Sequence, residues 1–162
     1  MVGIGGMGMS ALARYFFAKG NIVTGSDLRR SETTDDLIKE GIDITIGEAS
    51  TGNVSDDVTK LVYTPAAKAD NPEIMKAKEL GIPVSSYPEA LGEVTKEYFT
   101  IGISGSHGKS TTTSMLALVL IEAGLDPTVI VGTRLKEFYG SNFKEGKSKY
   151  LVIKLSPSDC CH

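Results

Sequence analysis

A chain of 162 residues is long enough for one large domain or two small ones, and its contents of 41% hydrophobic and 23% charged residues are those of a globular protein. The formal charge of −3 and the absence of a basic run argue against nucleic acid or an anionic membrane surface as the main partner. No apolar run approaches the roughly 18 to 20 residues of a membrane helix, so we expect a cytoplasmic protein that acts on small molecules.

The first segment of the chain predicts a strand, a glycine loop and a helix. Residues 2–4 read as the end of a strand, and residues 9–19 place apolar side chains at helical spacing before a glycine that ends the helix. A second strand is expected over residues 21–25. The strand at residues 2–4 is short, so we expect a few residues upstream of Met1, and Arg14 within the apolar start argues against a signal peptide.

The glycine loop between these elements carries a nucleotide-binding fingerprint. Gly3, Gly5 and Gly8 follow the order Gly-x-Gly-x-x-Gly, with Gly6 inside it, after a strand and before a helix. Asp27 lies 19 residues after Gly8, where a Rossmann unit places the acid that binds ribose. The pattern indicates a loop that binds a diphosphate, with NAD as the obvious ligand. A tight turn that only packs the helix on the sheet stays open as the alternative.

Strands and helices alternate through the rest of the first domain. Because their connections are short, the alternation predicts an α/β fold with a parallel, doubly wound sheet. A charged stretch near residue 95 marks a boundary, so we predict a Rossmann-like domain over residues 1–96 and the start of an ATPase domain over residues 97–162. In the first of these we expect strands over residues 42–46 and 61–63, helices over residues 31–40 and 71–80, and a last strand and helix within residues 81–91.

The second domain opens with another strand, turn and helix. The strand covers residues 98–103, and the helix over residues 111–123 is strongly apolar, which predicts that it is buried beside a sheet. After it we expect strands over residues 128–131 and 149–155. The stretch between them, residues 132–149, is polar and glycine-rich and is interpreted as a connection.

The turn between this strand and helix has the composition of a P-loop. Gly108, Lys109 and Ser110 open the helix. In such a loop, backbone N–H groups converge on a phosphate, the lysine reaches the terminal phosphates, and the hydroxyl binds Mg²⁺. The strict pattern places a glycine at the position of Ile103, so the match has one departure. A Gly/Ser-rich turn that only caps an ordinary helix is the alternative reading.

Two stretches of the chain resemble the same family. The variant loop Gly-x-x-Gly-x-His-Gly-Lys-Ser-Thr-Thr resembles the ATP loop of the Mur ligases, which use ATP to add amino acids to the peptidoglycan precursor, and His107 resembles the alanine-adding branch. GIGGMGMSALAR, at residues 3–14, is similar to the opening of UDP-N-acetylmuramate:L-alanine ligases, whose loop holds the UDP part of the sugar. The resemblance implies an ATP- and Mg²⁺-dependent ligase that forms an acyl phosphate on the lactyl carboxylate of UDP-N-acetylmuramate, which the amine of L-alanine then attacks.

The resemblance also implies roles for single residues. Lys109 would stabilise charge on the transferred γ-phosphoryl group, and Ser110 would ligate Mg²⁺. His107 would face the reacting carboxylate, or only pack the loop. The residues implied to bind ATP are Gly105, Ser106, His107, Gly108, Lys109, Ser110 and Thr111. Those implied to bind the UDP-sugar are Gly3, Gly5, Gly6, Gly8 and Asp27.

The end of the chain departs from the family pattern. The last strand should continue into an acidic motif whose first glutamate helps bind Mg²⁺, but Lys154 stands there and Pro157 follows. The rest of the family's central domain and its third domain do not fit within 162 residues, so we interpret the chain as a fragment of a truncated or frame-shifted gene, inactive by itself. A stand-alone NAD-type module and an unstable product of a decayed gene stay open as alternatives. The tail is interpreted as incidental, not as a metal site, although it holds Asp159, Cys160, Cys161 and His162.

Overall fold

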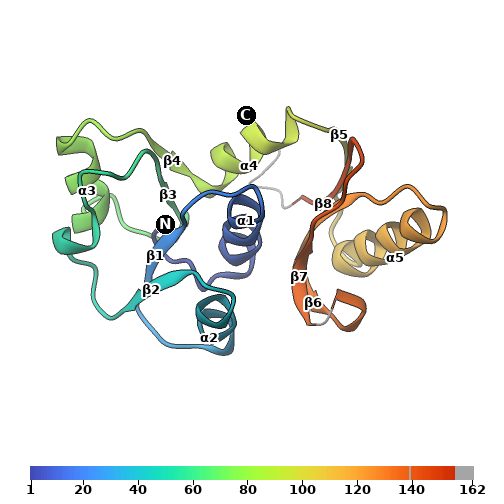
Figure 1. The fold of residues 1–162 in the computed structure, drawn as a ribbon, viewed down its shortest axis with the longest axis horizontal. Helices are drawn as coiled ribbons and strands as arrows, with labels where there is room; N and C mark the ends of the chain where they lie inside the picture. The colour runs from blue at the N-terminus through green and yellow to red at the C-terminus, as the bar shows by residue number, and fades with distance from the viewer. Residues whose placement is uncertain (139, 156–162) are drawn as a thin grey trace. The chain divides into compact units, whose positions relative to one another are not determined.

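The computed structural model of the chain describes residues 1–138 and 140–155. The chain forms two compact units that divide between Ala90 and Leu91, inside helix α4 (Tyr87–Thr95). In Figure 1 the first unit runs from blue to green, and the second begins in yellow-green. The domain boundary expected between residues 96 and 97 stays a prediction, since α4 continues through the point of division.

Parallel strands form the sheet of the first unit. β1 (Thr24–Asp27) pairs with β2 (Asp43–Ile46), and β3 (Leu61–Tyr63) pairs with β4 (Val84–Ser86), both in parallel. Val2 lies between the two pairs and forms parallel bridges to Ser26 of β1 and Tyr63 of β3. The strand expected over residues 2–4 is therefore a bridge at one residue, because the chain turns at Gly3, whose φ is +72°. The parallel α/β fold class is confirmed.

The helices of the first unit pack against its sheet through two apolar cores. α1 (Met7–Ala18) and α2 (Glu32–Lys39) contribute Ala13 and Leu37 to one core, together with Ile4. α3 (Pro72–Glu79) contributes Ile74 to the other, which also holds Leu61 of β3, and a short 3-10 turn, η1 (Thr51–Asn53), precedes β3. Two separate cores, one under each group of helices, are what a doubly wound sheet requires.

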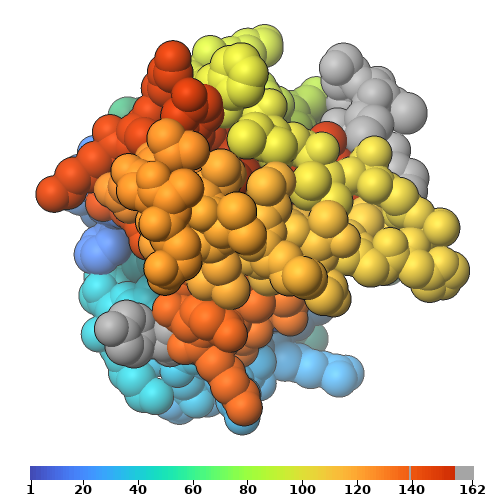
Figure 2. All heavy atoms as spheres, turned by 90° about the vertical axis from the view of Figure 1, so that its right-hand side faces the viewer, coloured from blue at the N-terminus to red at the C-terminus, as the bar shows by residue number. Residues whose placement is uncertain are grey.

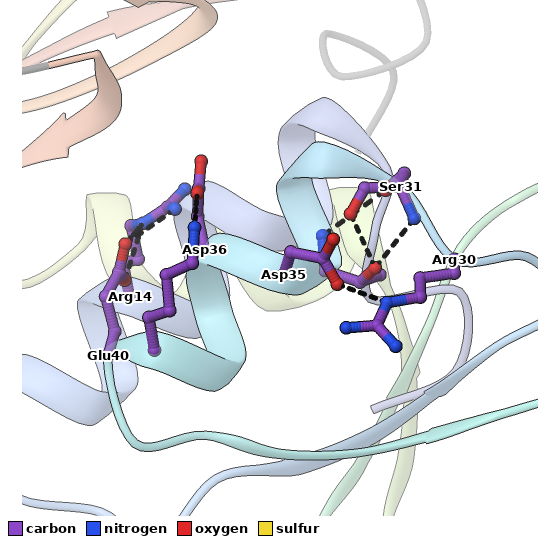
Figure 3. Close-up of polar contacts among 8 residues, drawn as sticks. Arg14, Arg30, Ser31, Asp35, Asp36 and Glu40 are labelled. Carbon is purple, nitrogen blue, oxygen red and sulfur yellow. Dashed lines mark hydrogen bonds and ion pairs between the residues drawn. The ribbon is translucent and has the colours of Figure 1, made fainter.

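Local side-chain contacts fix where these helices begin and how α1 meets α2. The hydroxyl of Ser31 accepts a hydrogen bond from the N–H of Thr34, and the Ser31 N–H in turn donates to the Thr34 hydroxyl oxygen, which forms a capping box at the start of α2. The buried Arg14 of α1 donates from Nε and Nη2 to the carboxylate of Glu40, at 2.8 to 3.0 Å (Figure 3). This forked ion pair connects α1 to the end of α2.

The second unit contains a four-stranded mixed sheet. Its strands are β5 (Phe99–Ile103), β8 (Tyr150–Lys154), β6 (Thr128–Leu135) and β7 (Ser141–Lys144), in that spatial order. The first three are parallel, whereas β7 runs antiparallel to β6. Helix α5 (Lys109–Glu122) follows β5, and its Ala117 packs in a core with Val129 and Val152 of the sheet.

The interpretation of residues 132–149 as a connection is wrong. This stretch completes β6, forms the 3-10 turn η2 (Lys136–Phe138), and adds the edge strand β7. Strand β7 has the sequence Ser-Asn-Phe-Lys and shows no apolar run. Its side chain Asn142 is nevertheless 1% exposed, and Ile130 of β6 pairs with Phe143. Pairing with β6, and not local apolar periodicity, produces this strand.

The burial predicted for the helix after β5 is also wrong for part of its surface. The buried residues of α5 are Thr113, Ser114 and Ala117. Figure 2 looks onto α5, drawn in orange. Two of its apolar side chains, Met115 and Val119, are each 63% exposed. In the described part of the chain, no helix is both long and apolar enough to cross a membrane.

Candidate functional site

In the first glycine loop, residues 3–8, the backbone donors of residues 3–6 form hydrogen bonds within the chain. The N–H groups of Gly3 and Ile4 both donate to the Ser26 carbonyl, at 2.9 and 3.1 Å. The Gly6 N–H donates to the Gly3 carbonyl at 3.2 Å, and the Gly5 N–H donates to Oδ2 of Asp27 at 2.8 Å. The loop is therefore held closed by the backbone of β1, by its own Gly3 carbonyl and by the Asp27 side chain at the end of β1.

Side chains at the carboxyl ends of the neighbouring strands approach the fingerprint glycines. A Cβ on Gly3 would lie 2.4 Å from a Thr64 methyl group, and a Cβ on Gly8 would lie 2.7 Å from the Tyr87 ring. Thr64 directly follows β3, and Tyr87 directly follows β4. Sequence reasoning missed both residues, because nothing in their local pattern indicates which loop they contact. The glycines therefore allow close approach of other side chains, which accounts for their spacing.

Asp27 lies where the sequence predicts it, at the end of β1 and beside the glycine loop. Its Oδ2 accepts from Gly5, and its Oδ1 accepts from the Arg29 N–H at 3.2 Å. A Cβ on Gly5 would lie 2.8 Å from Asp27 Oδ2 and 2.9 Å from a Thr34 methyl group. Gly5 is thus enclosed between β1 and the first turn of α2, and no larger residue fits without movement.

The second glycine loop, residues 104–108, is exposed along its whole length. Gly105 and Gly108 both have positive φ, +148° and +74°, and Gly108 is the N-cap of α5. Among the residues that the structure describes, no backbone N–H of residues 105–108 donates to a protein acceptor. His107 is exposed on this loop. The geometry leaves a row of donors at a helix N-terminus, which is the arrangement that binds anions.

The lysine of this loop is folded back onto it. Lys109 Nζ donates to the Gly105 carbonyl at 2.5 Å and to the Ser106 carbonyl at 3.2 Å. Ser110 is half-buried in the first turn of α5, and Thr111 beside it is exposed. The ammonium group of Lys109 therefore lies against the carbonyl groups of the loop.

A second lysine stands at the same edge of the sheet. Lys154 ends β8 and lies in register with Ile103, the last residue of β5 before the loop. A Cβ on Gly132 would lie 2.1 Å from Lys154 Nζ, so the glycine leaves the space that the lysine occupies. Within residues 1–138 and 140–155, no group of three His, Cys, Asp or Glu side chains is placed to hold a metal. The four tail residues considered for a metal site, Asp159, Cys160, Cys161 and His162, lie outside the described residues.

Known proteins resemble the chain in sequence over most of its length. The model of the Mur ligase family, catalytic domain, matches residues 1–99. A UDP-N-acetylmuramate–L-alanine ligase of Sulfurihydrogenibium is 48% identical over 158 residues, which cover 98% of this chain and 34% of that protein. The enzyme of the same name from Acetivibrio thermocellus is 46% identical over 154 residues. The chain spans about a third of the length of these relatives.

Solved structures give the same picture of the fold. The UDP-N-acetylmuramate–alanine ligase of Thermotoga maritima superposes with a TM-score of 0.88 at 35% identity, over 95% of this chain and 36% of that one. A UDP-N-acetylmuramate:L-alanyl-gamma-D-glutamyl-meso-diaminopimelate ligase from Neisseria meningitides superposes with a TM-score of 0.84 at 30% identity, over 94% of this chain and 50% of that one. The arrangement of strands and helices is therefore shared with longer proteins.

Proposed function

Because the chain belongs to the Mur ligase family, we propose that it forms the UDP-sugar-binding part and the phosphate-binding part of a ligase that joins L-alanine to UDP-N-acetylmuramate. The observation that carries the proposal is the pair of glycine loops, each between a strand end and a helix N-terminus. Relatives named for this activity are up to 48% identical over 98% of the chain, which supports it. ATP and both substrates of such a ligase are cytoplasmic molecules, and the proposal places the protein there.

The first unit would hold the UDP-sugar. The N-terminus of α1 carries the positive end of the helix dipole, which favours a diphosphate there. Gly3, Gly5 and Gly6 would shape the loop, while Gly8, whose missing side chain leaves room for the Tyr87 ring, would contribute its backbone to the site. Asp27 would complete the same site. We assign this role to the domain predicted over residues 1–96.

The second unit would hold ATP. The N–H groups of residues 105–108 would surround a phosphate, with Ser106 and Thr111 at its edges, and Lys109 would leave the Gly105 and Ser106 carbonyls to contact the terminal phosphates. His107, exposed on the loop, would face the carboxylate that receives the phosphoryl group. We assign this role to the domain predicted over residues 97–162.

The proposed reaction has two steps with defined leaving groups. A carboxylate oxygen of UDP-N-acetylmuramate attacks the γ-phosphorus of ATP, and ADP leaves. The amine of L-alanine then attacks the carbonyl carbon of the acyl phosphate, loses a proton, and displaces inorganic phosphate to leave an amide. The contribution of this chain would be to orient the γ-phosphoryl group and to balance its charge with Lys109.

Mg²⁺ fits the site less well than ATP does. The Ser110 hydroxyl would be one suitable ligand, and the ion would offset negative charge on the phosphates of ATP. Lys154, however, stands at the strand end where the resemblance places a glutamate, and an ammonium group repels a divalent cation. We therefore propose that this chain by itself binds its ligands but does not catalyse ligation.

The experiment that tests the proposal compares two ligands of the first unit. UDP-N-acetylmuramate and NADH are titrated separately into the purified chain, and heat of binding and thermal unfolding are followed. We expect UDP-N-acetylmuramate to bind and to raise the unfolding temperature, because a ligand of the folded state stabilises it. A larger shift with NADH would support a stand-alone dinucleotide-binding module and contradict the proposal.

A further inference from the structure

We propose that Asp27 is a positioning residue, which closes the glycine loop around the ligand site, and is not the acid that binds the ribose of the ligand. The inference rests on the proposed function of the first unit, and it assigns a different role to the residue at the ribose-binding position of a Rossmann unit. Its basis is the direction in which the carboxylate points in this structure.

Both oxygens of the Asp27 carboxylate are bound by backbone N–H groups of its own unit. Oδ2 accepts from Gly5 in the loop at 2.8 Å, and Oδ1 accepts from Arg29 just beyond β1 at 3.2 Å. A carboxylate that binds ribose must present an oxygen to the 2′-hydroxyl of the ligand. Here the shorter of the two hydrogen bonds is directed at the loop, so the carboxylate acts on the protein backbone.

The contact to Gly5 is sterically enforced. A Thr34 methyl group approaches Gly5 beside the Asp27 carboxylate, and both lie within 2.9 Å of the place where a Cβ would stand. Thr34 is itself fixed, because its hydroxyl and N–H both bond to Ser31 in the capping box of α2. Asp27 and Thr34 therefore hold Gly5 between them, and the start of α2 is part of the support.

Closing the loop determines which donors face a ligand. The N–H groups of Gly3, Ile4 and Gly6 are used by carbonyl groups within the chain, and that of Gly5 is used by Asp27. The first hydrogen bond of α1 runs from the Ser10 N–H to the Gly6 carbonyl, so Gly8 lies in the first turn, before this bond. A diphosphate would consequently meet the first turn of α1, with Asp27 keeping that turn in place through Gly5.

The first test measures the loop without any ligand. Amide hydrogen exchange at Gly5 is followed by NMR in the whole chain, in its original form and in the variants Asp27→Ala and Asp27→Asn. We expect protection of the Gly5 amide to fall about tenfold or more in Asp27→Ala, and to remain in Asp27→Asn, whose side-chain oxygen can still accept the bond. Unchanged protection in Asp27→Ala would overturn the proposal.

The second test separates a positioning role from a ribose contact. UDP and 2′-deoxy-UDP are titrated into the chain and into both variants, with Asp36→Ala, at a half-buried acid of α2, as the control for the same charge change. We expect Asp27→Ala to weaken both ligands about tenfold, and equally, and Asp27→Asn to stay within about threefold of the original chain. A residue that binds the 2′-hydroxyl would instead lower the preference for UDP over 2′-deoxy-UDP when it is removed, and that result would overturn the proposal.

The two tests distinguish this inference from the proposed function. If the original chain binds neither UDP nor UDP-N-acetylmuramate, the proposed function fails, and Gly5 exchange still decides whether Asp27 orders the loop. If UDP binds and Gly5 exchange is insensitive to Asp27→Ala, the inference fails while the proposed function stands.

Discussion

The two glycine loops of this chain are ordered by different parts of the molecule. In the first loop, the N–H groups from Gly3 to Gly6 donate to a neighbouring strand, to the loop itself or to Asp27. In the second, no backbone N–H of residues 105–108 has an acceptor among the described residues, and the Lys109 ammonium bonds to loop carbonyls. Both loops follow a strand and precede a helix.

The difference shows that one motif can be preorganised in two ways. Side chains from other strands contact the first loop, so its conformation is fixed without a ligand. A ligand would then contact the helix that follows the loop. The second loop keeps its own donors open, and its lysine ammonium bonds to loop carbonyl groups. We therefore expect the first loop to respond mainly to steric changes and the second mainly to changes of charge.

The largest effect is expected from Lys109→Ala in the second loop. Removing the charge that reaches the terminal phosphates should weaken a non-hydrolysable ATP analogue with Mg²⁺ about a hundredfold, because charge-assisted hydrogen bonds are the strong ones. Isothermal titration calorimetry measures this change in affinity. Lys136→Ala, an exposed lysine of η2, is the matched control and should bind like the original chain. Equal affinity in Lys109→Ala and the original chain would contradict the expectation that charge controls ligand binding at this loop.

Lys154→Glu also tests how charge controls ligand binding at the second loop. The change restores an acid at the strand end beside the loop, so the affinity for the ATP analogue with Mg²⁺, relative to that in EDTA, should rise about tenfold. Lys149→Glu makes the same charge change at the opposite end of β8 and should leave that ratio unchanged. If both variants respond alike, the effect is one of net charge and not of position.

Gly5→Ala probes the steric control of the first loop. A Cβ there would overlap Asp27 and Thr34, so the free energy of unfolding of the first unit should fall by about 1 to 3 kcal/mol. Denaturant unfolding measures this change. Gly52→Ala in η1, also in the first unit, is the control, because the nearest atom to its Cβ position is Ser50 Oγ at 3.7 Å, an ordinary contact distance. Alanine there should leave the free energy of unfolding within about 0.5 kcal/mol of that of the original chain. If Gly5→Ala leaves the free energy of unfolding unchanged, the loop accommodates a Cβ at this position without loss of stability.

The smallest effect concerns a contact of the second unit far from its loop. Between α5 and β6, the pKa of Asp126 is lowered by a hydrogen bond from Lys144 Nζ at 2.6 Å and then by the Lys147 N–H. Since the folded pKa lies below the unfolded one, this stabilisation is present above the unfolded pKa and is lost as the pH falls through the folded pKa.

Thermal unfolding between about pH 5 and pH 2 measures this dependence. The original chain should lose slightly more stability over this range than Asp126→Asn does. Glu122→Gln, an exposed acid at the end of α5, should behave like the original chain. If Asp126→Asn keeps the full pH dependence, the contact has no measurable role in stability.

Several elements were predictable because their signals are local. The strand at Leu61–Tyr63 matches its predicted bounds, and the helices that begin after Ser31 and Asn71 start where their capping residues predict. A cap acts within one turn, so adjacent residues are enough to specify it. The two strand, loop and helix units, and with them the family resemblance, were also readable from the sequence.

The tertiary structure alone decided which distant residues meet these local units. Strand β7 exists because β6 pairs with it, and the exposed Met115 and Val119 of α5 show that an apolar helix is buried only where a partner lies. Thr64 and Tyr87 reach the first loop from other strands, and Asp27 turns its carboxylate to Gly5. Residues far apart in the chain make these contacts, and their free energy depends on packing and hydrogen bonding in three dimensions, which local periodicity and propensity do not encode.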